Sequence, residues 1–201
     1  KIPILDTLLI SAVAIIDDIE NIVTMDAKKE GSSIYVIGET KNEMGGSHYN
    51  EMIGLGLETG NVPVIDAAKS KRTFAAVEEA IKKRAVLACH DCSEGGLAVA
   101  LAEMCFAGGI GAEAELRSVP HNSSDISDEA VLFSESQTRF IAEVEKGKEA
   151  MFEEAMKKYG CRYGMIGKTK GKQLVIRGSS GKLIDLDINE LKEAWQRPLK
   201  W

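Results

Sequence analysis

The sequence is poor in the features that mark several classes of protein. Aromatic residues make up 5% of the chain, and there are 4 prolines and 4 cysteines. Four cysteines are too few for a disulfide framework, which predicts a reducing, cytoplasmic environment. No apolar run approaches the roughly 18 residues that span a bilayer, because Asp17 and Asp18 end the longest one. No signal-peptide pattern opens the chain. We therefore expect neither a membrane span nor a secretory leader.

Clusters of basic residues are also missing. The 25 Lys and Arg residues are outnumbered by 31 Asp and Glu, which gives a net charge of −6. A nucleic-acid footprint is therefore not expected. The 44% of apolar and 28% of charged residues are typical of a soluble globular protein. The length predicts a single domain over residues 1–201. Because Lys1 stands where an initiator Met would, we expect a fragment whose residues 1–12 are the tail of a preceding domain.

Hydrophobic periodicity predicts strands and helices in mixed order. One predicted helix starts at Asp66 and places Phe74, Val77 and Ile81 on one face. Strands are expected at 9–19, 32–40, 85–91, 110–119, 138–145 and 164–169, with a hairpin over 173–187. Helices are expected at 66–84, 97–109, 148–160 and 188–195, a short one within 42–57, and a turn capped by Ser127 or Asp128. Several connections are too short for parallel crossovers, so the predicted fold class is α+β, with a mixed or antiparallel sheet covered by helices.

The most conspicuous motif is the Cys-x-x-Cys formed by Cys89 and Cys92. A structural zinc site needs four ligands, and no second pair is present. A redox pair is expected at the start of a helix, where the dipole lowers the pKa of the first thiol, but Cys89 lies inside an apolar strand. We interpret both as small buried residues and predict no metal ligands. A free-standing zinc or redox domain is the alternative, and it predicts bound metal or a thiol of low pKa.

The same stretch continues into a turn, Ser93-Glu94-Gly95-Gly96, between a predicted strand and helix. Ser93 is expected to cap the helix, and free backbone N–H groups there could hold a phosphate or carboxylate. The glycines would let a ligand or another backbone approach closely. A candidate anion-binding turn therefore comprises His90, Asp91, Ser93, Gly95 and Gly96. A turn and cap without a ligand would explain the same residues.

A second polar stretch, LFSESQTRF, leads into an apolar strand. Glu135, Gln137 and Arg139 share the same parity along it. A carboxylate, an amide and a guanidinium on one face would suit recognition of a polar, phosphorylated ligand. A strand entrance that faces water is an equally good explanation.

Four stretches together resemble one enzyme family. They are VIGETKNEMGGSHY, HDCSEGGLAVALAEM, LFSESQTRF and KLIDLDINELKEAWQRPL, and they are similar to segments of phosphoribosylformylglycinamidine synthase subunit II. The matches are collinear from about residue 13 to residue 199. That family shares a superfamily with aminoimidazole ribonucleotide (AIR) synthase, selenophosphate synthetase, thiamine-monophosphate kinase and a hydrogenase maturation protein. HDCSEGGL favours the synthase over these relatives.

The resemblance implies a fold like the C-terminal domain of AIR synthase, and a position as the last of four domains. It implies an enzyme of de novo purine biosynthesis that converts formylglycinamide ribonucleotide and glutamine-derived ammonia to an amidine with ATP and Mg²⁺. The upstream domains would bind ATP and Mg²⁺, so the resemblance implies no catalytic residue here and no activity of the isolated chain. Partners would be those domains, a glutaminase subunit and a small accessory subunit.

The resemblance also bears on the site. Glu135, Ser136 and Gln137 match a triplet that contacts the ribonucleotide substrate in the first-half copy of this domain. Two alternatives remain open. The chain could be a structural or interaction module that completes a pseudo-symmetric scaffold, or the equivalent domain of a related superfamily enzyme.

Overall fold

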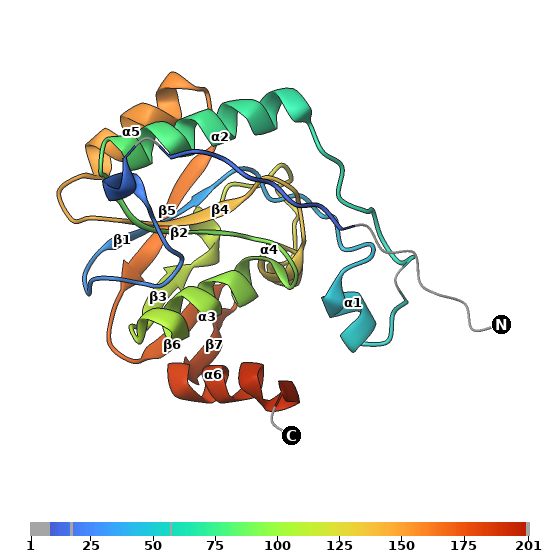
Figure 1. Cartoon of the computed structure of the whole chain (residues 1–201). Coiled ribbons are helices and arrows are strands. Elements are labelled where there is room, and N and C mark those ends of the chain that lie inside the picture. Colours follow the sequence, from blue (N-terminus) through green and yellow to red (C-terminus); the bar gives the residue numbers. More distant parts are fainter. Residues whose placement is uncertain (1–8, 17, 57, 200–201) are drawn as a thin grey trace.

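A computed structural model describes residues 9–16, 18–56 and 58–199, and it is built on one mixed sheet (Figure 1). The seven strands lie in the order β2-β4-β1-β5-β3-β6-β7. All neighbours are antiparallel except β3 and β6. The strands are β1 (Ser33–Ile37), β2 (Val86–Asp91), β3 (Ala112–Glu115), β4 (Phe140–Val144), β5 (Tyr163–Thr169), β6 (Gln173–Gly178) and β7 (Gly181–Asp187). The predicted fold class is confirmed.

Helices cover both faces of the sheet. Helices α2 and α5 pack on one face around Tyr35, Phe152 and Met156, and α3, α4 and α6 close the other around Ile34, Leu101 and Ile141. Tyr35 and Ile34 are neighbours on β1, so their alternation sends one side chain into each core. The helices are α1 (His48–Met52), α2 (Ala67–Lys82), α3 (Gly96–Gly108), α4 (Asp128–Phe133), α5 (Glu149–Lys158) and α6 (Ile188–Gln196). None of those in the described part of the chain is long and apolar enough to cross a bilayer.

Most of the predicted elements are present, and their caps explain where they begin. The Asp66 carboxylate accepts a hydrogen bond from Lys69 N at 3.0 Å, which starts α2. Ser127 rather than Asp128 caps α4, since its hydroxyl accepts from Ala130 N at 3.2 Å. The Asp128 carboxylate instead accepts from the backbone and the hydroxyl of Ser179 in the β6–β7 turn.

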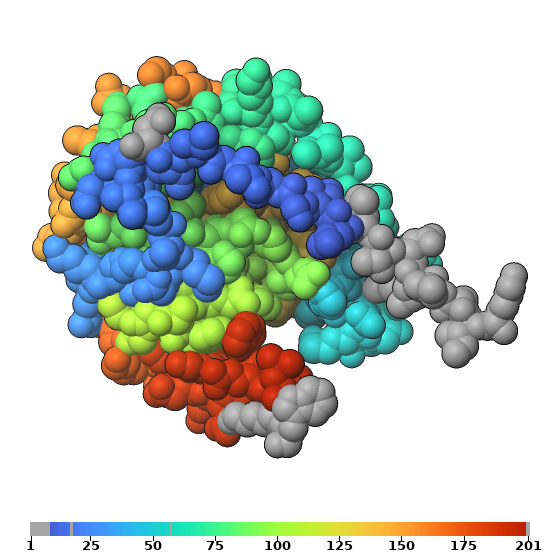
Figure 2. Space-filling view, viewed as in Figure 1, coloured from blue at the N-terminus to red at the C-terminus, as the bar shows by residue number. Residues whose placement is uncertain are grey.

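The predicted strand at 9–19 is wrong within the described residues. Residues 9–16 form no helix or strand, and a 3-10 turn begins at Ile19. The segment runs across the outside of the molecule (Figure 2), and Leu9, Val13 and Ile15 are 87%, 98% and 93% exposed. Its β-branched residues favour an extended chain, but a strand also needs a partner for its backbone. This chain supplies none among the residues described.

The predicted apolar face of α2 is also wrong in one position. Val77 is buried and Ile81 half-buried, but Phe74 is 53% exposed. The buried stripe runs instead through Thr73, Val77 and Ala80. Phe74 lies to the side of that stripe with its ring centre 6.0 Å from that of Phe140, edge to face. The aromatic ring therefore lines a cavity rather than the core.

Candidate functional site

The two polar stretches predicted as separate sites meet through one carboxylate. Oε1 of Glu135 accepts hydrogen bonds from Gly95 N at 2.9 Å and from His48 N at 3.1 Å. The Glu135 carboxylate thus joins the segment that precedes β4, the turn that starts α3 and the first residue of α1. Forty residues separate Glu135 from Gly95 in the sequence, so only the tertiary fold brings them together.

Beside this junction lies a cavity of about 580 Å³, here called the acidic cavity. Asp91, Ser93, Glu135 and Gln137 line it, so four of the predicted site residues share one space. Phe74 and Phe140 add an apolar wall that the sequence did not indicate. The remaining lining residues are Ile65, Cys92, Glu94, Thr138 and Arg139. A carboxylate-rich cavity with aromatic sides suits a ligand that presents hydrogen-bond donors.

The glycine turn is held by the chain itself. Gly95 N donates to Glu135, and Gly96 N donates to the carbonyl of Ser93 at 3.1 Å. Both glycines have positive φ, and a Cβ on Gly96 would lie 2.6 Å from the carbonyl oxygen of Ser134. The glycines therefore allow the close approach of another backbone, which is one of the two predicted roles. Anion binding at this turn stays a prediction, and these two N–H groups already have acceptors.

Ser93 does not cap α3, contrary to prediction. Gly95 occupies the N-cap position in a left-handed conformation and makes no side-chain cap. The Ser93 hydroxyl instead donates to the Asp91 carboxylate. This hydrogen bond is the main reason that the pKa of Asp91 is lowered.

His90 belongs to a separate network of polar side-chain contacts. Its Nε2 lies 2.9 Å from Oε2 of Glu103 on α3, and Oε1 of Glu103 accepts from Trp195 Nε1 of α6 at 3.1 Å. His90 and Asp91 are adjacent on β2, and their ring nitrogen and carboxylate lie 3.4 Å apart. His90 therefore connects the end of β2 to the C-terminal helix and does not line the acidic cavity.

Two residues of the LFSESQTRF stretch are structural in this fold. Ser136 is 1% exposed, and its hydroxyl accepts from Lys41 N at 3.1 Å. Arg139 is also 1% exposed, and its guanidinium donates to the carbonyls of Ser134 and Ser136 and to Oγ1 of Thr40. Burial lowers the pKa of Arg139. Of the predicted triplet, only Glu135 and Gln137 line the cavity.

The Cys-x-x-Cys pair has the environment of buried structural thiols. Burial raises the pKa of Cys89 to about 12 and that of Cys92 to about 11. A raised pKa is the opposite of what a redox or nucleophilic thiol needs. Within residues 9–16, 18–56 and 58–199, no three His, Cys, Asp or Glu side chains are grouped to hold a metal ion. The redox alternative is therefore not supported by the geometry.

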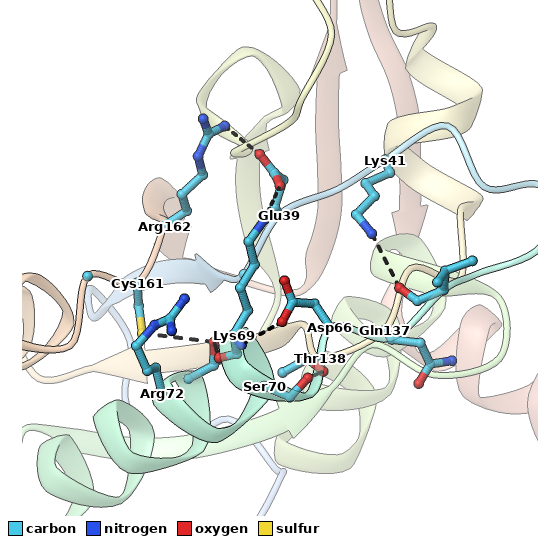
Figure 3. Close-up of a pocket in the computed structure, with 14 residues that line it drawn as sticks. Glu39, Lys41, Asp66, Lys69, Ser70, Arg72, Gln137, Thr138, Cys161 and Arg162 are labelled. Carbon is cyan, nitrogen blue, oxygen red and sulfur yellow. Dashed lines mark hydrogen bonds and ion pairs between the residues drawn. The ribbon is translucent and has the colours of Figure 1, made fainter.

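A second cavity, of about 220 Å³, adjoins the first and is here called the basic cavity (Figure 3). Lys41, Lys69, Arg72 and Arg162 line it together with two carboxylates, Glu39 and Asp66. Gln137 and Thr138 line both cavities. Its other lining residues are Gly38, Val64, Ser70, Thr73, Gly160 and Cys161.

Thr138, which separates the two cavities, has an unusual backbone. Its φ is +60°, an outlier for a β-branched residue. Its hydroxyl lies 2.7 Å from that of Ser70 on α2, and a Cβ on Gly38 would come within 2.5 Å of the Thr138 carbonyl oxygen. Backbone strain of this kind is often found at functional sites. Sequence reasoning missed the basic cavity because its cations lie far apart in the sequence: Lys41 is in the loop between β1 and α1, Lys69 and Arg72 are on α2, and Arg162 directly precedes β5.

Comparison with known proteins gives the same fold and relates it to one family. The model of the AIR synthase related protein, C-terminal domain, matches residues 29–178. Among solved structures, Thermotoga maritima PurL complexed with FGAR superposes with a TM-score of 0.75 at 20% identity, over 86% of this chain and 30% of that one. The hydrogenase maturation protein HypE superposes with a TM-score of 0.57 at 15% identity, over 81% and 54%. At these identities the structures establish the fold alone.

Curated relatives are closer in sequence. The phosphoribosylformylglycinamidine synthase subunit PurL of Moorella thermoacetica is 36% identical over 96% of this chain. The subunit of the same name from Methanocaldococcus jannaschii is 35% identical over 96%. The chain spans about a quarter of the length of these relatives, 25% and 26% respectively. Because the family model covers most of the chain, this protein belongs to the family of AIR synthase related proteins, as their C-terminal domain.

Proposed function

We propose that this chain is the C-terminal domain of a phosphoribosylformylglycinamidine synthase. The enzyme would use ATP, Mg²⁺ and glutamine-derived ammonia to convert formylglycinamide ribonucleotide to its amidine in cytoplasmic purine biosynthesis. The observation that carries this proposal is the 36% identity to the Moorella PurL over 96% of the chain. The Moorella and Methanocaldococcus relatives are named as subunits of that synthase, and this chain matches about a quarter of each.

Within such an enzyme, the domain would act mainly as a scaffold. The exposed apolar segment at 9–22 supports this role, since Ile10, Ile16 and Ile19 are 78%, 59% and 76% exposed. Apolar side chains in a row along an extended segment are typical of a surface that another protein part covers. We propose the upstream domains of the same polypeptide as that part, with a glutaminase subunit and a small accessory subunit as further partners.

Among the described residues, no three His, Cys, Asp or Glu side chains are grouped to hold a metal ion. In line with the family resemblance, we assign ATP and Mg²⁺ to the upstream domains of the same polypeptide and derive no catalytic step here. If the domain also contacts the ribonucleotide, Glu135 and Gln137 are the residues that would face it, since both line the acidic cavity. Ser136 would act by holding the loop, through its contact with Lys41.

A chimaera tests this assignment. The quarter of the Moorella PurL that matches this chain is replaced by residues 9–199, and ammonia-dependent amidine formation is measured. The expected result is a chimaera that retains turnover, while the 201-residue chain alone has none. Turnover by the isolated chain would contradict the proposal that the upstream domains carry out catalysis. A folded chimaera without activity would overturn the family role.

The scaffold role has a separate readout. Glu135→Gln and Gln137→Ala in the chimaera are compared for thermal stability and for KM of the ribonucleotide. A scaffold predicts changes in stability with KM unchanged. A raised KM at unchanged stability would instead make this loop a substrate-binding element.

A further inference from the structure

The cationic side chains near the candidate site line the basic cavity and not the glycine turn. Four cations and two carboxylates line that cavity. Glu39 pairs with Arg162 at 2.7 Å and with Lys69 at 3.9 Å, so one carboxylate holds two of the cations at the rim (Figure 3). Lys41 has its own partner in Glu43, at 3.3 Å. The cations therefore exceed the carboxylates that line the same space.

Arg72 is the cation with the least compensation. It is exposed at the second turn of α2, and among the described residues no carboxylate lies within ion-pair distance of its guanidinium. Asp66, its neighbour in the cavity, is already engaged by Lys69 N at 3.0 Å. A guanidinium presents paired N–H donors that match the oxygens of a phosphate.

The size and walls of the cavity restrict the ligand further. A volume of about 220 Å³ is below the roughly 300–1,000 Å³ of sites for drug-sized ligands. The hydroxyls of Ser70, Thr73 and Thr138 line it beside the cations. The positive φ of Thr138 and the absence of a Cβ at Gly38 allow the loop before β4 and the loop after β1 to approach closely where both line the cavity. Four separate segments thus converge on a small cationic pocket with hydroxyl donors.

We infer that the basic cavity is a binding site for a phosphate group, with Arg72, Lys69 and Arg162 as its cationic ligands. The phosphate is either free or carried by an ester small enough for a cavity of about 220 Å³. The site is distinct from the glycine turn and from the acidic cavity, and it does not depend on the proposed synthase role. Gln137, which lines both cavities, would lie beside the bound group.

Calorimetric titration of the 201-residue chain with inorganic phosphate and with ribose 5-phosphate, at constant ionic strength, tests the site. Arg72→Gln is expected to weaken binding about 10-fold or more, because a charge-assisted hydrogen bond is lost. Lys71→Gln is the matched control: Lys71 is exposed on the same helix but does not line the cavity. It is expected to change the affinity by less than about twofold, as a surface charge should.

The relative affinities for ribose 5-phosphate and inorganic phosphate distinguish the two kinds of ligand. Tighter binding of ribose 5-phosphate than of phosphate supports a site for an ester, and equal binding supports a site for the phosphate group alone. No binding of either at millimolar concentration overturns the inference. Equal weakening by Arg72→Gln and Lys71→Gln also overturns it, because the attraction would then come from the surface as a whole. Circular dichroism of both variants confirms that they are folded.

Discussion

The acidic and basic cavities share a wall, yet their charges are used in opposite ways. In the acidic cavity, the Glu135 carboxylate is bound to the backbone of Gly95 and His48, so a charged group serves the fold. In the basic cavity, the Arg72 guanidinium makes no ion pair with a carboxylate of the described residues and has only a weak, longer-range attraction to Asp66. The comparison shows that a polar sequence motif, here the one that contains Glu135, can form a structural contact. The charged side chain without an ion-pair partner, Arg72, lies in the neighbouring cavity.

Removing the buried Arg139 should affect both cavities most strongly. Arg139→Ala leaves two carbonyls and the Thr40 hydroxyl without their donor in a buried place. We expect a loss of roughly 3–5 kcal/mol in the free energy of unfolding, since each orphaned group costs about 1–3 kcal/mol. Urea denaturation measures it. A loss below that of the exposed control Arg117→Ala would show that the wall does not need the guanidinium.

Glycines of the two cavities should differ in their tolerance of a methyl group. Gly96→Ala places a Cβ 2.6 Å from Ser134 O, whereas Gly160 in the basic cavity has nothing within 4 Å. Both have positive φ. We expect about 2–4 kcal/mol of destabilisation for Gly96→Ala. For Gly160→Ala we expect about 1–2 kcal/mol, because the positive φ is then the only source of strain. Equal losses in thermal or chemical denaturation would contradict the close packing of the glycine turn.

The Glu135 junction can be tested by separating its charge from its hydrogen bonds. Glu135→Ala removes the acceptor for Gly95 N and His48 N and should cost about 1–2 kcal/mol. Glu135→Gln keeps a carbonyl oxygen at the same place and should cost less than about 1 kcal/mol. If the two variants are equally destabilised in urea, then the charge rather than the acceptor geometry holds the junction.

The smallest expected effects are in the titration of one aspartate from each cavity. The pKa of Asp91 is lowered mainly by the Ser93 hydroxyl, and that of Asp66 mainly by Lys69 N. A lowered pKa means that the carboxylate adds stability above its ordinary value of 3.8, and that this is lost as the pH falls through its folded pKa. Ser93→Ala should raise the pKa of Asp91 toward its ordinary value, so the variant has less of this stabilisation and its loss is complete at a higher pH.

For Asp66, Arg72→Gln should raise the pKa only slightly, because Arg72 is a minor cause beside the Lys69 N–H group. Carbon-detected NMR titration of the two carboxyls measures both changes. A larger shift of the pKa at Asp66 than at Asp91 would show that the charge of Arg72 matters more than the hydrogen bond from Ser93.

Elements that depend on residues close together in the sequence were predicted correctly. The Asp66 cap, the helix at 97–109 and the hairpin over 173–187 follow from local spacing, and all are present. Prediction failed at 9–19, where β-branched residues lack a partner strand, and at Phe74, where the helix rotates its apolar stripe by one position. Both failures depend on what the segment packs against, which periodicity does not contain.

The site residues divide in the same way, into those that a local motif indicates and those that only tertiary contacts bring into the site. Glu135, Gln137, Asp91 and Ser93 were found as polar residues in two motifs, and the fold places them in one cavity. Glu103, Arg72 and Arg162 were missed because each stands alone in an ordinary charged stretch. Their importance comes from contacts across long sequence separations, such as the 92 residues between Glu103 and Trp195.

The order of strands in the sheet also bears on how the chain reaches its fold. The interior strand β1 (Ser33–Ile37) lies between β4 (Phe140–Val144) and β5 (Tyr163–Thr169) and pairs with both. Both partners come roughly 100 or more residues later, and such distant pairings slow folding. At a synthesis rate of about 5–20 residues per second, β1 waits several seconds on the ribosome with its backbone unpaired. We therefore expect the apolar side chains of the SIYVI strand to be accessible to chaperones during translation.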